Sequence, residues 1–122
     1  MAAWSQYEWC GNRGNIRCFL KLAGTEFLPD PSGKIIFLES LGGRVNRIAS
    51  LVAQIQQIGC FNVCSGLILG SFTELEHHNE LPILEEYIKE VTKQSNIPIV
   101  KTDELGHGDN CKGIMIGKRI DL

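Results

Sequence analysis

Glu39 and His107 are the two residues of this sequence whose settings best fit acid–base chemistry. Glu39 directly follows the apolar run 35–38, and His107 is flanked by a glycine on each side. A histidine base needs a nucleophile within hydrogen-bond reach and a third group that fixes its tautomer. The pair therefore indicates the orienting acid and the base of a nucleophilic triad. No serine lies in a G-x-S-x-G elbow that would expose a nucleophile.

Each of these residues also has a plainer interpretation. Glu39 alone fits a strand-end acid that caps the next turn or pairs with Arg44 or Arg47. His107 alone fits a loop histidine, because paired glycines mark turns more often than active sites. Asn110 follows closely and is a candidate to orient the imidazole or contact a ligand, although asparagine in a tight turn also bonds its own backbone.

The sequence contains little that indicates a metal site or a nucleotide-binding site. His77 and His78 are adjacent, and adjacent side chains do not converge on one ion, so a solvated loop is the expectation there. The five cysteines are an odd number at irregular spacing, which predicts reduced thiols. Neither a Gly-Lys-Ser/Thr phosphate loop nor a G-x-G-x-x-G turn occurs. We expect no metal and no cofactor.

Composition bounds the class of protein. A chain of 122 residues with 43% hydrophobic residues can build one core, so a single domain is expected. The 12 basic and 14 acidic residues are spread without blocks, which argues against a nucleic-acid partner. The apolar stretches are of strand length and the first residues form no basic-then-apolar leader. We therefore expect a soluble, cytoplasmic protein with no membrane partner.

The elements that must position these residues alternate between strand and helix. Segment 1–14 lacks a sustained period and reads as a linker before a domain at 15–122. Asn15 is a plausible N-cap for a short helix that ends near Gly24. Helical stripes at 48–58 and 83–91 follow, the first ended by Gly59 and the second begun at Pro82. Apolar runs of strand length occupy 34–38, 63–69 and 97–100.

This order predicts an α/β fold. Strand, helix, strand, helix, strand gives a parallel core with right-handed crossovers and flanking helices. A terminal hairpin around Gly117 and Lys118 would add antiparallel pairing, so a mixed sheet in a single domain is expected. The run 34–38 is too short for a buried helix and reads as a strand with both faces covered.

Read in order, these segments resemble the carboxyl-terminal domain of the LD-carboxypeptidase family. That family of serine peptidases includes the muramoyltetrapeptide carboxypeptidases of peptidoglycan recycling and the microcin self-immunity proteins. The similarity covers nearly the whole chain from about residue 11, and it depends on the segments 14–16, 23–30, 33–39, 59–61, 66–72, 97–98 and 106–108, with Arg47 and Asn110.

The resemblance implies a swivelling β/β/α fold and a division of labour. Glu39 and His107 match the glutamate and histidine of a Ser-His-Glu triad, whose serine and oxyanion donors belong to an amino-terminal, flavodoxin-like domain. Asn15 and Asn110 are carried over as substrate-binding candidates. The partners implied are that nucleophile domain and a peptide substrate. Asn46 departs from the family, which commonly has an aspartate before Arg47.

Three functions fit this sequence. The first is the carboxyl-terminal half of a serine carboxypeptidase that hydrolyses an amide bond in peptidoglycan-derived LD-peptides and is inactive without the serine domain. The second is a binding module that recognises cell-wall peptide without catalysis. The third is a structural dimerisation domain, in which an apolar patch pairs two copies as a homodimer.

Overall fold

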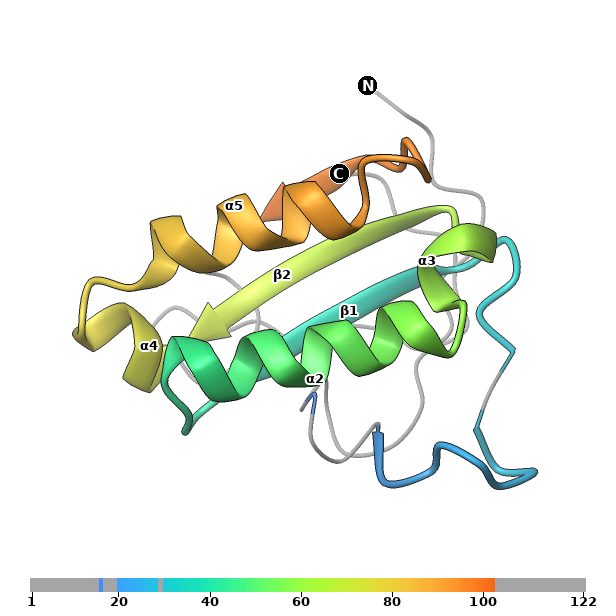
Figure 1. Cartoon of the computed structure of the whole chain (residues 1–122), viewed down its shortest axis with the longest axis horizontal. Coiled ribbons are helices and arrows are strands. Elements are labelled where there is room, and N and C mark those ends of the chain that lie inside the picture. The colour runs from blue at the N-terminus through green and yellow to red at the C-terminus, as the bar shows by residue number, and fades with distance from the viewer. Residues whose placement is uncertain (1–15, 17–19, 29, 103–122) are drawn as a thin grey trace.

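The chain folds as an α/β domain. The computed structural model describes Ile16, residues 20–28 and residues 30–102. The elements in chain order are β1 (Ile35–Ser40), α2 (Val45–Gln57), α3 (Cys60–Val63), β2 (Gly66–Phe72), α4 (Thr73–His77), α5 (Leu81–Val91) and β3 (Ile99–Lys101). Figure 1 shows this alternation, which confirms the predicted α/β class with flanking helices.

The described strands form a three-stranded sheet in the order β1-β2-β3, and both pairings are parallel. Successive parallel strands joined by right-handed crossovers place both connecting helices on the same face. In Figure 1, α2 and α5 accordingly lie side by side in front of β1 and β2. The antiparallel hairpin expected near Gly117 and Lys118 lies outside the described residues.

The core lies between this sheet and the two helices. Every residue of β1 and β2 is buried, as the short apolar runs predicted. Burying these side chains contributes about 25 cal/mol per Å2 of apolar surface, which is the main force holding the layers together. The packed cluster includes the helical residues Ile48, Val52, Ile55, Leu84 and Ile88 and the strand residues Ile36, Leu38, Leu67 and Leu69.

The predicted bounds of the second and third strands were wrong by a few residues. Val63 was expected to begin a strand, but it ends α3 and is 46% exposed. The Cys64 N–H donates to the Cys60 carbonyl and closes a helical turn. A short apolar run does not distinguish a strand from a helical turn, and here the local hydrogen bond favours the turn. The third strand is Ile99–Lys101 rather than 97–100.

Two further predictions on helices need correction. Ile58 was placed on the buried stripe of the first long helix, but α2 ends at Gln57 and Ile58 is 41% exposed. Gly59 does end this helix, with a φ of +86°. The stretch around His77, expected to be a solvated loop, instead forms α4, because fully buried Leu75 anchors it to the core.

The structure describes part of the predicted amino-terminal helix. Ile16 and Leu20 are helical and buried, and Gly24 has a φ of +84°, consistent with a helix that ends before this glycine. The proposed N-cap Asn15 and the linker at 1–14 lie outside the described residues. Among the helices that can be assessed, none combines the length and apolar character needed to cross a bilayer.

Candidate active site

Glu39 is the predicted site residue that the structure describes most clearly. It lies one residue before the end of β1, and its exposed fraction is 0%. Parallel strands of an open α/β sheet present ligands and catalytic groups at their carboxyl ends. Burial of a carboxylate carries a desolvation cost of several kcal/mol, so such groups concentrate at functional sites. Glu39 therefore has both the position and the burial of a functional acid.

A break in strand pairing occurs at Glu39. Leu38 pairs with Leu69, but Ser40 pairs with Phe72, so Glu39 faces the two residues Gly70 and Ser71. A bulge of this kind bends the strand and changes the direction of a side chain, and bulges are frequent beside active sites. The break in strand pairing therefore lies at Glu39, the acid that sequence analysis identified as a candidate.

Two of the groups offered as plainer partners of Glu39 have other contacts in the structure. The turn after β1 is capped by Ser40, whose Oγ donates a 2.6 Å hydrogen bond to the Gly42 carbonyl. Arg44 pairs with Glu80, with 2.5 Å between Nε and Oε1. Glu39 itself is fully buried, so it is not a solvated acid.

The other strand ends lie at the same edge of the sheet. Ser71 lies near the end of β2 and is buried, and Lys101 ends β3. The Thr102 N–H donates a 2.9 Å hydrogen bond to the Leu69 carbonyl, which keeps the chain against β2 just beyond β3. The segment that leads towards residue 107 therefore leaves the described part of the chain at the edge where Glu39 lies.

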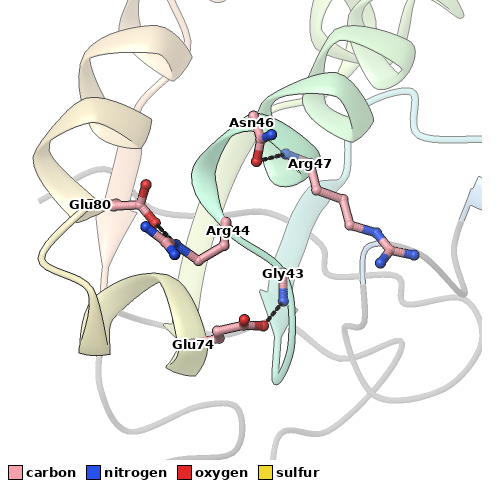
Figure 2. A network of polar contacts seen from close by, with 6 residues as sticks. All are labelled: Gly43, Arg44, Asn46, Arg47, Glu74 and Glu80. Atoms are coloured by element: carbon pink, nitrogen blue, oxygen red, sulfur yellow. Dashed lines mark hydrogen bonds and ion pairs between the residues drawn. The ribbon is translucent and has the colours of Figure 1, made fainter.

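Three acids in and after α4 fasten the loops around this edge. Figure 2 shows Glu74 Oε2 accepting a 2.5 Å hydrogen bond from the Gly43 N–H, and Glu80 bound to Arg44. The hydrogen bond from Arg44 lowers the pKa of Glu80. Glu76 accepts a 2.6 Å hydrogen bond from the Phe72 N–H. Sequence analysis did not single out these acids as site residues, although Glu74 and Glu76 lie within four residues of the end of a buried strand, a position like that of Glu39.

Asn46 and Arg47 lie on the first turn of α2. The Asn46 Oδ1 accepts a 3.0 Å hydrogen bond from the Arg47 N–H, while the Arg47 side chain points away from the acids in Figure 2. Arg47 lines an open depression of ≈ 400 Å3 between α2 and the amino-terminal segment, together with Leu20, Lys21, Leu51 and Gln54. An aspartate, which the resemblance implies at position 46, has a side-chain oxygen that could accept the same hydrogen bond from the Arg47 N–H.

Cys60 and Cys64 are free thiols buried in the core. Burial, followed by the nearby Cys64 thiol, raises the pKa of Cys60 to about 11. Burial also raises the pKa of Cys64. Because the thiolate is the reactive form, neither side chain has the setting of a nucleophile. Within the part of the chain that can be described, no three His, Cys, Asp or Glu side chains gather as a metal site.

The structure does not test the whole predicted site. His107, Asn15 and Asn110 lie outside the described residues, so the pairing of Glu39 with His107 stays a prediction. The described residues show the buried acid Glu39, the carboxyl edge of the sheet where it lies, and the position of Thr102, after which the chain continues towards residue 107.

Comparison with known proteins identifies related sequences. Residues 13–122 match the family model described as the LD-carboxypeptidase C-terminal domain. A Synechocystis sp. protein named "Putative carboxypeptidase slr1534" is 28% identical over 111 residues, which is 89% of this chain and 37% of that protein.

Solved structures share the fold. The microcin C7 self-immunity protein MccF, as an active-site mutant and in complex with aspartyl sulfamoyl adenosine, superposes with a TM-score of 0.73 at 18% identity. It is matched over 100% of this chain and 35% of its own length. Muramoyltetrapeptide carboxypeptidase from Oxalobacter formigenes gives a TM-score of 0.65 at 21% identity, over 97% of this chain and 42% of its own. The chain thus spans about two fifths of the length of these relatives.

Proposed function

Because this chain belongs to the family of LD-carboxypeptidase C-terminal domains, we propose that it contributes Glu39 and His107 to a Ser-His-Glu triad. The triad would hydrolyse the amide bond before the terminal D-amino acid of a peptidoglycan-derived LD-peptide. The serine and the oxyanion donors would come from a region of such enzymes that this chain does not match.

The observation that carries the proposal is the complete burial of Glu39 at the carboxyl end of β1, beside a bulge. An orienting carboxylate in a triad must be shielded from water, because shielding strengthens its interaction with the imidazolium that forms during the reaction. A solvated acid at a strand end would lack this property. Burial thus favours the orienting role over a surface role.

The chain topology supports the pairing with His107. Thr102 is held at the carboxyl edge by its bond to Leu69, and His107 follows 107 − 102 = 5 residues later. Five residues reach at most about 17 Å. β3 lies two strand spacings from β1, or about 10 Å. His107 is therefore within reach of Glu39 without displacement of the sheet.

In the proposed reaction, His107 takes the proton of the serine hydroxyl and then gives it to the leaving amine. Glu39 holds the imidazole in the tautomer that accepts this proton and stabilises its charged form. Asn15 and Asn110 are proposed to contact the peptide. Without serine and oxyanion donors, the acid and base supply little rate enhancement, so we expect the isolated chain to be inactive.

The test is reconstitution. The chain is fused to, or mixed with, the amino-terminal half of a family member, and release of D-alanine from a muramyl tetrapeptide is measured. We expect activity that is lost in Glu39→Gln and His107→Ala and retained in Glu86→Gln, which changes an exposed acid on α5. An active fusion whose Glu39→Gln variant keeps the parental rate would rule out the orienting role.

A further inference from the structure

The carboxylate of Glu76 connects two strand ends. Its Oε2 accepts a 2.6 Å hydrogen bond from the backbone N–H of Phe72, the last residue of β2. Its Oε1 lies 3.4 Å from Nζ of Lys101, the last residue of β3. One side chain of α4 thus binds the backbone of one strand and the side chain of the next.

These two contacts flank the bulge at Glu39. Phe72 pairs with Ser40, the position where β1 and β2 resume their register after the bulge. Lys101 pairs with Leu69, the last β2 residue in register before the bulge. Glu76 therefore binds Phe72 on one side of the irregular stretch of β2 and, on the other side, Lys101, the β3 neighbour of Leu69.

From this geometry we propose that Glu76 is a positioning residue for the pair formed by Glu39 and His107. By holding Phe72 it fixes the bulge at Glu39, and by holding Lys101 it fixes the start of the segment that carries His107. The inference rests on the proposed function, because it assigns Glu76 to the geometry of that same triad.

Burial and charge make this contact more than an ordinary surface pair. The side chains of Lys101 and Glu76 are only 21% and 26% exposed, so solvent screens them less than a fully exposed pair. A backbone N–H bound to a carboxylate is also roughly twice as strong as a neutral hydrogen bond.

The neighbouring acids serve a different part of the fold. Glu74 binds the Gly43 N–H and Glu80 binds Arg44, so both hold the loop between β1 and α2. Among the residues that the structure describes, Glu76 is the acid bound to both β2 and β3. Its loss should therefore affect the path towards His107 in a way that the loss of the other acids does not.

Amide hydrogen exchange on the whole chain tests the connection without any need for activity. In Glu76→Gln we expect exchange at Phe72 and Thr102 to accelerate about three- to tenfold, because the amide oxygen of glutamine replaces charge-assisted contacts with weaker neutral ones. In Lys101→Met, Thr102 should accelerate while Phe72 keeps its rate. Glu86→Gln serves as the matched control. Parental rates at both amides in Glu76→Gln would overturn the proposal.

The titration of His107, followed by NMR, tests the positioning role itself. The chain has three histidines, and His107→Ala identifies the resonance of interest. If Glu39 orients His107, Glu39→Gln lowers the pKa of His107, because a nearby carboxylate stabilises the imidazolium. Glu76→Gln should then reproduce part of this fall, whereas Glu86→Gln should not.

The outcomes separate the two proposals. A pKa of His107 that responds to Glu39→Gln but not to Glu76→Gln overturns the positioning role and leaves the proposed triad standing. A pKa that responds to neither variant overturns both. A reconstituted enzyme with faster exchange in Glu76→Gln should also show a lower kcat with an unchanged KM, because the substrate contacts are retained.

Discussion

The backbone N–H of Gly43 donates a hydrogen bond to Glu74 Oε2 across 31 residues of sequence. This bond fastens the loop that follows β1 to α4 at the carboxyl edge of the sheet, as Figure 2 shows. Gly43 has a φ of +114°, and a Cβ added to it would lie 3.0 Å from Ile48 Cδ1. The loop beside Glu39 is therefore constrained by backbone conformation, by packing and by one acid.

Gly43→Ala should destabilise the fold by about 2 kcal/mol, because a positive φ costs about 1–3 kcal/mol for alanine and the new methyl group crowds the end of the buried Ile48 side chain. Gly24→Ala is the matched control. Its φ is also positive, at +84°, but nothing lies within 4 Å of the added Cβ. Urea unfolding measures both variants. Equal losses would show that packing against Ile48 contributes nothing.

Glu39→Gln should remove activity while sparing stability. In the reconstituted enzyme we expect a fall of about 10³- to 10⁴-fold in kcat, because an amide does not stabilise the imidazolium or fix its tautomer. The free energy of unfolding should stay within about 1 kcal/mol of the parent or rise, because the variant no longer buries a charge. A loss above about 3 kcal/mol in urea unfolding would instead identify Glu39 as a structural anchor.

The stability of the chain should fall above pH 9. The folded state raises the pKa of Cys60 from 9.0 to about 11, so the unfolded chain loses this proton first. The stabilisation that the buried, protonated Cys60 thiol gives the folded state is therefore complete below pH 9 and is lost as the pH rises to about 11. Urea unfolding across this window should show a shallower decline in Cys60→Ala. If the free energy of unfolding falls equally steeply with pH in both proteins, the raised pKa of Cys60 does not cause the decline.

The end of α2 gives a direct test of core packing. Ile55 is fully buried and Ile58 is 41% exposed, although both lie on one apolar stripe of the sequence. Ile55→Ala should cost about 2–5 kcal/mol, because it leaves a cavity. Ile58→Ala should cost clearly less, because 41% of this residue is already exposed to solvent and its truncation leaves no enclosed cavity. Thermal and urea unfolding measure both, and comparable losses would show that Ile58 belongs to the core.

Much of the architecture followed from local pattern. The first strand, both long helices and the α/β class were predictable, because a buried strand reads as an unbroken apolar run and an amphipathic helix as a 3.6-residue stripe. Strand bounds near Val63 failed, since a helical turn and a strand can share the same short apolar run. α4 was missed because its one buried apolar anchor, Leu75, gives no period.

The sequence by itself determined the class of the fold, the family and the choice of Glu39 as a candidate acid, because these depend on residue order and spacing. Only the tertiary structure decided that Glu39 is buried beside a bulge, that Ser40 caps the turn and that Arg44 pairs with Glu80. It also decided that Glu76 bridges Phe72 and Lys101. Such contacts join residues that are distant in the chain, and their partners are set by how strands and helices pack.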